Sequence, residues 1–198
     1  ALDGAPAGTD GIEVFLDGQP NRGGEAEGDT LTGIEHVIAT ARNDTLHGGS
    51  AGEWIEAGAG DDRMTSSAGA DRFDGGAGTD TLDYSGSAKG VDARLDGTAG
   101  KGGDAAGDTA SGIENLIGSA HDDTLTGDGG DNRLTGGAGA DHVDGAGGTD
   151  TVDFSTSETA VEVYLDGRTS RGGEAEGDTY AHIEVLDGSA FDDRLTGA

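Results

Sequence analysis

The sequence of 198 residues has no cysteine, two prolines, one tryptophan and only 11 basic residues. Without cysteine, neither disulfides nor thiolate metal sites are available. No stretch approaches the ~18 consecutive apolar residues of a membrane-spanning helix. With 40 acidic residues and a net charge of −29, the chain is also a poor candidate for binding nucleic acid or an anionic membrane without bridging cations.

Large apolar residues are scarce as well. Leu, Ile, Val and Phe total 31 of 198 residues, about 16 %, whereas foldable sequences usually exceed roughly 20 %. Ordering such a chain costs on the order of 300 kcal/mol of conformational entropy. So few apolar side chains cannot offset that cost, and the acidic side chains repel one another on compaction. Composition therefore predicts disorder unless cations take part in the fold.

What the sequence does contain is a period of nine residues. Five successive nonapeptides span 39–83 and four span 118–153, with an apolar residue in the eighth place. The nonapeptide GGAGTDTLD matches the pattern G-G-x-G-x-D-x-U-x, in which U is a large apolar residue. The sixth places hold Asp44, Glu53, Asp62, Asp71 and Asp80 in the first block, and Asp123, Asn132, Asp141 and Asp150 in the second.

A longer unit occurs three times and separates the blocks. It reads IEVFLDGQPNRGGEAEGDT at 12–30, VDARLDGTAGKGGDAAGDT at 91–109 and VEVYLDGRTSRGGEAEGDT at 161–179, and an Ile-Glu pair follows each copy. The aspartates of its GDT motif are Asp29, Asp108 and Asp178, spaced by 79 and then 70 residues. The two spacings differ by one nonapeptide, which is the insertion that a stacked coil tolerates. The sequence therefore predicts one continuous solenoid.

The expected organisation is a single repeat solenoid over 1–198. It divides into a first wide unit at 1–38, five repeats at 39–83, a second wide unit at 84–117, four repeats at 118–153, a third wide unit at 154–187 and the start of a further block at 188–198. Because Ala198 falls two residues into a new nonapeptide, we expect the chain to be a piece of a longer repeat protein.

The local pattern favours strands over helices. Ile12, Val14 and Leu16 alternate with more polar residues, the period of a half-buried strand, and the other two wide units repeat the pattern. The 41 glycines oppose helix throughout. The expected fold class is therefore all-β.

The nonapeptides resemble those of the RTX (repeats-in-toxin) family, whose repeats are also called hemolysin-type calcium-binding repeats. The resemblance implies a right-handed parallel β-roll with two nonapeptides per turn and calcium between loops eighteen residues apart. Calcium takes six to eight oxygen ligands, which glycine-rich loops supply as carbonyls beside the aspartates. The implied pairs are Asp44 with Asp62, Glu53 with Asp71, Asp62 with Asp80, Asp123 with Asp141, and Asn132 with Asp150.

The resemblance implies about five or more calcium ions. Beyond the sixth-place residues of the two blocks, the expected ligands include Asp193 and the carbonyls of Gly58, Gly60, Gly76, Gly78, Gly137 and Gly139. Asp29, Asp108 and Asp178 are either further ligands or turn caps. Ala51, Ser66 and Ser67 replace loop glycines, so we expect the Glu53/Asp71 site to be the weakest and those around Asp62, Asp80 and Asp141 the firmest.

Enzymatic activity is not expected. The sequence has no GxSxG motif and no cysteine nucleophile, and the repeat accounts for nearly every candidate carboxylate of an acid/base pair. His36, His47, His121, His142 and His182 lack zinc-site spacing. Phe15, Arg94 and Tyr164 share one outward position in the three wide units, so they are a candidate row for contacting glycan, and Trp54 is expected to cover an edge.

The functional hypothesis is a calcium-binding module that folds on extracellular calcium. It would be a structural or adhesive segment of a larger secreted or cell-surface bacterial protein, exported by a type I route. One alternative is the C-terminal secretion and folding module of an exported hydrolase or toxin. Another is a calcium-dependent glycan-binding module. Besides calcium, the candidate partners are cell-surface polysaccharide and neighbouring repeats of the same chain, which we expect to be a monomer.

Overall fold

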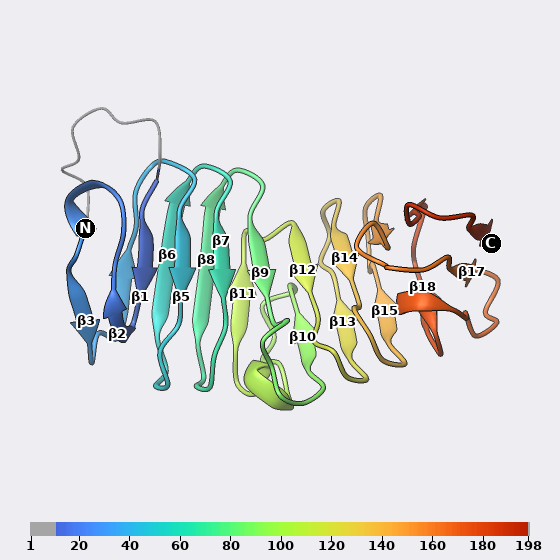
Figure 1. Cartoon of the computed structure of the whole chain (residues 1–198), viewed down its shortest axis with the longest axis horizontal. Coiled ribbons are helices and arrows are strands. Elements are labelled where there is room, and N and C mark those ends of the chain that lie inside the picture. Colours follow the sequence, from blue (N-terminus) through green and yellow to red (C-terminus); the bar gives the residue numbers. More distant parts are fainter. Residues whose placement is uncertain (1–10, 198) are drawn as a thin grey trace.

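A computed structural model describes residues 11–197, so 1–10 and Ala198 lie outside the described part of the chain. Within it, twenty short strands and three 3-10 helices stack along one long axis, from the N-terminal to the C-terminal end (Figure 1). Nearly all strand pairs are parallel. The all-β fold class and the parallel β-roll architecture expected from the sequence are therefore confirmed.

One face of the roll is an eight-stranded parallel sheet, which we call the continuous sheet. It runs in the order β1-β5-β7-β9-β12-β14-β16-β19. Its strands are β1 (Glu13–Phe15), β5 (Thr45–His47), β7 (Arg63–Thr65), β9 (Thr81–Asp83), β12 (Asn115–Ile117), β14 (Arg133–Thr135), β16 (Thr151–Asp153) and β19 (Val185–Asp187).

The opposite face, which we call the interrupted face, consists of three shorter parallel sheets. The first contains β4 (His36–Ile38), β6 (Trp54–Ala59), β8 (Arg72–Ala77) and β11 (Thr109–Ser111). The second contains β10 (Asp92–Arg94), β13 (Thr124–Thr126), β15 (His142–Asp144) and β18 (Thr179–Ala181), and the third β17 (Glu162–Tyr164) and β20 (Arg194–Thr196). A separate antiparallel pair joins β2 (Asp17–Pro20) to β3 (Thr30–Thr32).

Within each block the strands pair with a shift of eighteen residues. Leu46 lies opposite Met64, which lies opposite Leu82, while Ile55 pairs with Phe73 on the other face. These eighth-place side chains are at most 1 % exposed. Because side chains alternate along a strand, the apolar residue enters the core and its two neighbours face outward. Two nonapeptides therefore make one turn of the roll, as predicted.

Each wide unit opens with a strand that pairs with the strand thirty-two residues further on, as Val14 does with Leu46 and Ala93 with Leu125. The chain then turns through a 3-10 helix whose last residue is a buried alanine. These helices are η1 (Gly24–Ala26), η2 (Gly103–Ala105) and η3 (Gly173–Ala175). Each wide unit thus buries an alanine of a 3-10 helix, an element that the nonapeptides do not contain.

The wide units begin on different faces of the roll. β1 belongs to the continuous sheet, whereas β10 and β17 lie on the interrupted face. The cause is the parity of the blocks. Five half-turns separate the first two wide units and four separate the last two, so only the odd block moves the next unit to the opposite face. A wide unit can therefore be built on either face.

Candidate calcium sites

The sixth-place residues stack directly on one another through the backbone. The backbone N–H of Asp44 donates to Oδ1 of Asp62 at 2.6 Å, and that of Asp62 donates to Oδ1 of Asp80 at 2.8 Å. The same bond joins Glu53 to Asp71, Asp123 to Asp141, and Asn132 to Asp150, at 2.8 to 2.9 Å. The structure therefore brings together all five pairs that the family resemblance implies.

The second carboxylate oxygen of most of these residues is buried without a partner. In the described part of the chain, such oxygens are found on Glu53, Asp62, Asp71, Asp80, Asp141 and Asp150. The residues themselves are at most 5 % exposed. A buried carboxylate without a compensating partner is costly, and it is normally paired or bound to a metal. Six orphaned oxygens in regular rows are the observation that best fits bound cations.

Glycine keeps the space beside these oxygens open. A Cβ atom added to Gly136 would lie 2.4 Å from Oδ2 of Asp141. One added to Gly76 would lie 2.1 Å from the carbonyl oxygen of Gly58 in the loop below, and the φ of Gly76 is +94°. Gly58, Gly60, Gly78, Gly137 and Gly139 also have positive φ and contact the preceding loop in the same way. Glycine at these positions thus lets carbonyl and carboxylate oxygens approach the backbone of the neighbouring residues closely.

Burial makes the repeat carboxylates hard to ionise. It raises the pKa of Asp71 and of Asp141 to about 7, and that of Asp62 to about 6. The pKa values of Asp80 and Asp150 are raised by the same cause. A divalent cation between the loops would reverse these shifts, because it favours the ionised form.

The donor set suits calcium better than a transition metal. Across residues 11–197, no three side chains of His, Cys, Asp or Glu gather closely enough to hold a metal by themselves. Each site must therefore combine one or two carboxylates with backbone carbonyls, which is a calcium-type set. The residues present fit the ion that the repeat pattern implies.

The first acidic residue of each block has both oxygens occupied by the protein. Oδ1 of Asp44 accepts from the N–H of Ile12, and its Oδ2 accepts from the N–H of Thr40, each at 2.8 Å. Asp123 and Asp193 are held in the same way, by Val91 and Ser119 and by Val161 and Ser189 respectively. These hydrogen bonds favour a role in joining each block to the wide unit before it.

The aspartates of the GDT motif are also hydrogen-bonded at both oxygens in two of the three units. Oδ1 of Asp108 accepts from the N–H of Asp71 at 2.8 Å, while its Oδ2 accepts from the hydroxyls of Tyr84 and Ser66, each at 3.0 Å. Oδ1 of Asp178 accepts from the N–H of Asp141, and its Oδ2 accepts from the Tyr180 hydroxyl at 2.8 Å. The capping alternative is thus favoured for both residues.

Asp29, in contrast to the buried Asp108 and Asp178, is exposed. Two residues that the sequence reasoning missed do join the rows: Oε2 of Glu114 accepts from the N–H of Asp80 at 2.8 Å, and Oε2 of Glu184 accepts from the N–H of Asp150 at 2.9 Å. The signal was present in the sequence, because each glutamate precedes the first aspartate of the following block by nine residues.

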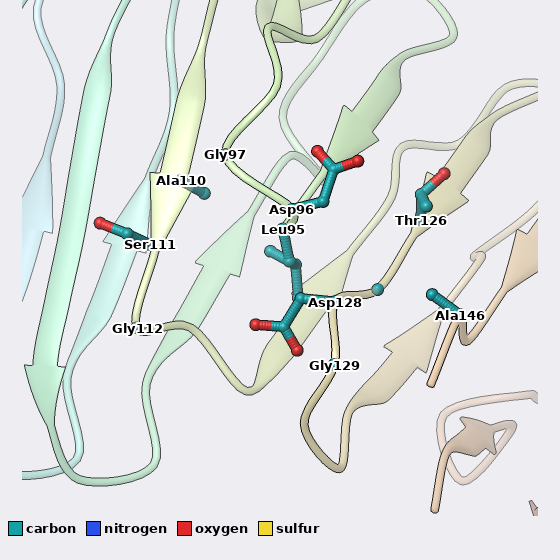
Figure 2. Close-up of a pocket in the computed structure, with 11 residues that line it drawn as sticks. Leu95, Asp96, Gly97, Ala110, Ser111, Gly112, Thr126, Asp128, Gly129 and Ala146 are labelled. Atoms are coloured by element: carbon teal, nitrogen blue, oxygen red, sulfur yellow. The ribbon is translucent and has the colours of Figure 1, made fainter. Parts of the chain in front are cut away.

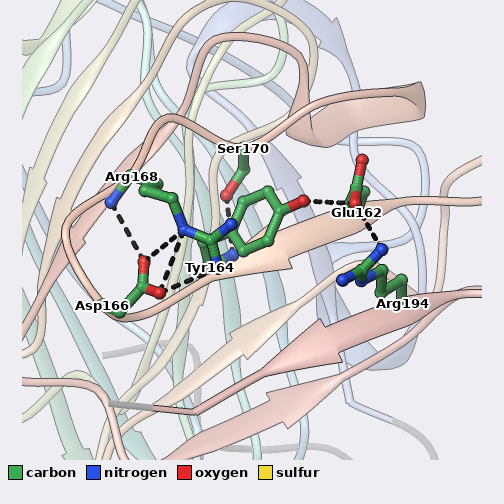
Figure 3. Close-up of polar contacts among 6 residues, drawn as sticks. All are labelled: Glu162, Tyr164, Asp166, Arg168, Ser170 and Arg194. Atoms are coloured by element: carbon green, nitrogen blue, oxygen red, sulfur yellow. Dashed lines mark hydrogen bonds and ion pairs between the residues drawn. The ribbon is translucent and has the colours of Figure 1, made fainter.

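The candidate glycan-contacting row does not form. Phe15 lies on the continuous sheet, stacked on His47, whereas Arg94 and Tyr164 lie on the interrupted face. Tyr164 is only 7 % exposed, because the guanidinium of Arg168 covers its ring at 3.7 Å from the centroid (Figure 3). The parity of the first block separates the three residues, and local packing removes the aromatic surface of the third unit.

Trp54 was expected to cover an edge, but it lies on the central strand β6. There its ring stacks on His36 at a centroid distance of 4.1 Å and lies beneath the guanidinium of Arg72. These contacts cover the outer surface of the first sheet of the interrupted face. Trp54, which is 36 % exposed, therefore packs on the outer surface of the roll.

A groove of about 410 Å³ lies where the interrupted face breaks between β11 and β10 (Figure 2). Two carboxylates flank it, those of Asp96 and Asp128, and each is held in its own turn, by the N–H groups of Thr98 and Gly130. The hydrogen bond from the Thr98 side chain lowers the pKa of Asp96, which makes this carboxyl a poor general acid. The groove therefore adds no support for catalysis.

Comparison with known families agrees with the geometry. A model of the RTX calcium-binding nonapeptide repeat, which describes four copies, matches residues 29–51, 47–82 and 117–152. No curated protein matches the sequence. Among the described residues, no helix is long and apolar enough to cross a membrane.

Proposed function

The chain carries RTX calcium-binding nonapeptide repeats, and from this we propose that it is a module whose folding depends on extracellular calcium. The observation that carries the proposal is the set of six buried carboxylate oxygens without partners, all within the two repeat blocks. Calcium binding itself follows from the family. The coupling of folding to binding is our inference from the burial of these charges.

The residues that hold calcium are the orphaned carboxylates together with loop carbonyls. In the first block these are Glu53, Asp62, Asp71 and Asp80, and in the second Asp141 and Asp150. Bound calcium supplies positive charge that compensates their desolvation. The chain's own part is to stack the loops in register, to exclude water from the carboxylates and to leave space beside the glycines.

Binding at several sites can supply the stability that the small core lacks. A ligand that binds only the native state adds about 2.7 kcal/mol per site at one hundred times Kd. About five sites would add roughly 13 kcal/mol, which is comparable to the whole stability of an ordinary domain. Magnesium should substitute poorly, because it dehydrates reluctantly and demands a tighter octahedral geometry.

The setting that suits such a module is outside the cell, where calcium is abundant. We propose that the chain is a structural or adhesive segment of a larger secreted or surface protein, unfolded during type I export and folded after it. Its regular, acidic surface and the absence of cysteine support a spacer stabilised by ions rather than by disulfides. The alternative, a secretion and folding module of an exported hydrolase or toxin, uses the same calcium chemistry.

The proposal is tested by small-angle scattering of the purified chain in chelator and then in millimolar calcium or magnesium. We expect an expanded chain in chelator, a compact rod in calcium and little contraction in magnesium. Equal contraction by both ions would remove the case for calcium-specific sites. A rod of unchanged length in chelator would show that folding does not need calcium.

A further inference from the structure

At two places a short loop of a wide unit stacks on a full repeat loop. β11 pairs with β8 at a shift of 37 residues, whereas β12 pairs with β9 at a shift of 34. The connection between β11 and β12 is therefore only three residues long, and it lies against the six residues 75–80, which form the end of β8 and its turn into β9. The third wide unit repeats this arrangement, with 182–184 against 145–150. We call these two places the junctions.

Each junction contains a fully buried aspartate with an unused oxygen. Asp80 and Asp150 are both 0 % exposed, and Oδ2 of each has no hydrogen-bond partner. Their Oδ1 atoms accept from the preceding turn, from Asp62 and Asn132 respectively. Oδ2 of each aspartate is therefore available to bind a cation between its own loop and the wide unit.

A carbonyl oxygen of the wide unit points into the same space. A Cβ added to Gly75 would lie 2.6 Å from Oδ2 of Asp80 and 2.0 Å from the carbonyl oxygen of Gly112. At the second junction, a Cβ added to Gly145 would lie 2.5 Å from Oδ2 of Asp150 and 2.2 Å from the carbonyl oxygen of His182. Inside the second block the same construction surrounds Gly127, whose added Cβ would meet Oδ1 of Asn132 at 2.4 Å and a carbonyl oxygen at 2.5 Å.

The backbone of the short loop is held in an unusual conformation at both junctions. Gly112 has a φ of +60°, and His182 has a φ of +50°, although L-residues with side chains rarely adopt it. Nδ1 of His182 lies 2.7 Å from Oδ1 of Asp144, and this contact fixes the histidine. Gly33, in the same place of the first wide unit, has a φ of +64°, so the left-handed conformation is a feature of the short loop in all three wide units.

The first block also contacts the second wide unit where the loop 66–71 meets Asp108, and this contact is built differently. There the loop starts with Ser66 in place of glycine, and its hydroxyl bonds to Oδ2 of Asp108, which also accepts from the Tyr84 hydroxyl. Protein hydroxyls therefore occupy Oδ2 of Asp108. The junctions contain no such hydroxyl partner for Asp80 or Asp150 in the described structure.

We propose that each junction binds one calcium ion, which fastens the wide unit to the block before it. The ligands at the first junction are Asp80, the carbonyl of Gly112 and the carboxylate of Glu114. At the second they are Asp150, the carbonyl of His182 and Glu184. The inference rests on the proposed function, because it extends the calcium rows beyond the nonapeptides into the wide units.

The test is the number of calcium ions bound by the full chain, counted by native mass spectrometry and by equilibrium dialysis. Glutamine at 114 and 184 keeps an acceptor for the N–H of Asp80 or Asp150 but removes the charge. We expect Glu114→Gln and Glu184→Gln each to lose one ion or to weaken one ion at least tenfold, and the double variant to show both effects. Glu35→Gln is the matched control, because this exposed glutamate holds the same place in the first wide unit.

An unchanged count with unchanged affinities in the double variant would overturn the inference while leaving the repeat sites intact. Absence of calcium binding by the parent chain would instead overturn the proposed function itself. Circular dichroism at saturating calcium reports whether the variants fold. If the double variant does not fold, the single Glu184→Gln variant gives the same reading near the C-terminal end, where fewer turns depend on the junction.

Discussion

The repeat blocks and the wide units differ in how they compensate their buried acidic side chains. Both stack acidic side chains on the backbone of the preceding turn, with distances of 2.6 to 2.9 Å. In six acidic residues of the blocks the second oxygen is buried and unpaired, whereas the second oxygens of Asp108 and Asp178 in the wide units accept from tyrosine hydroxyls. If calcium compensates the unpaired oxygens, as we propose, the blocks should depend on calcium more strongly than the contacts of Asp108 and Asp178 do.

The two regions also differ in apolar content. A nonapeptide buries one large side chain per half-turn, such as Met64 or Leu134. The second wide unit buries Tyr84, Val91, Leu95 and Ile113, as well as several alanines. Because apolar burial contributes about 25 cal/mol per Å², the wide units have more stabilisation that is independent of metal. Variants in the two regions should therefore respond differently to calcium.

The largest effect is expected from breaking the register of a block. Deleting 66–74 removes one nonapeptide and moves the second wide unit to the other face, a change that the positions of β1 and β10 already illustrate. Deleting 66–70 instead misplaces Asp71 and turns Phe73 out of the core. In calcium-dependent thermal melts, we expect the shorter deletion to lower Tm far more. Equal melting of the two deletants would mean that the coils do not stack in register.

The next effect separates two ligands of the first block. Asp62 is bonded to Asp44 and Asp80 and belongs to two stacked pairs, while Glu53 lies in a loop in which Ala51 replaces a glycine. We expect Asp62→Ala to raise the calcium midpoint of folding several-fold and Glu53→Ala to shift it less than about twofold. Both midpoints come from one circular dichroism titration. Indistinguishable midpoints would contradict the sharing of Asp62 between two sites.

Acid should partly replace calcium in the blocks. Burial raises the pKa values of Asp71 and Asp141 to about 7, above the value of about 3.9 in an unfolded chain. The folded chain then binds more protons than the unfolded one, so the calcium-free fold gains stability as pH falls and loses it as pH rises through about 7.

In chelator, we therefore expect more β-structure at pH about 5 than at pH about 7.5. The calcium midpoint should move the other way, rising in acid because protons compete with the metal. Circular dichroism at both pH values measures the two effects. A lower β content at the acidic pH, without calcium, would show that the buried carboxylates do not limit folding.

The smallest effect is expected from removing a tyrosine hydroxyl that hydrogen-bonds to an aspartate of a wide unit. Tyr180→Phe removes the only side-chain hydroxyl that hydrogen-bonds to Oδ2 of Asp178 among residues 11–197, whereas Tyr84→Phe leaves the Ser66 hydroxyl on Asp108. We expect Tyr180→Phe to cost about 1 to 3 kcal/mol and Tyr84→Phe less, as for a lost buried hydrogen bond. Thermal melting in saturating calcium measures both. The number of bound ions should not change. Loss of an ion would indicate that Asp108 or Asp178 is a calcium ligand.

Where the nine-residue period is regular, the pairing of the strands and of the acidic side chains can be predicted from the sequence. The nine-residue repeat, with the two repeats per turn that the family resemblance implies, gives the pairing of Leu46 with Met64 and of Asp44 with Asp62. The roles of Glu114 and Glu184 were missed because a three-residue loop replaces the six-residue one at the junctions. The bond from Tyr84 to Asp108 spans twenty-four residues outside the period, so no spacing rule indicates it.

The candidate row of Phe15, Arg94 and Tyr164 does not form, for a different reason. The three residues are equivalent in sequence, but the odd number of repeats in the first block puts Phe15 on the opposite face. Equivalence within a unit therefore does not give position on the solenoid unless the half-turns between units are counted.

The most direct test of the calcium dependence of the blocks is far-UV circular dichroism of the whole chain, first in chelator and then through a titration to millimolar calcium. The six orphaned carboxylate oxygens lead us to expect a disordered spectrum in chelator at neutral pH and a cooperative change to a β-rich spectrum as calcium is added. A spectrum that is already β-rich in chelator, and that calcium does not change, would contradict the account.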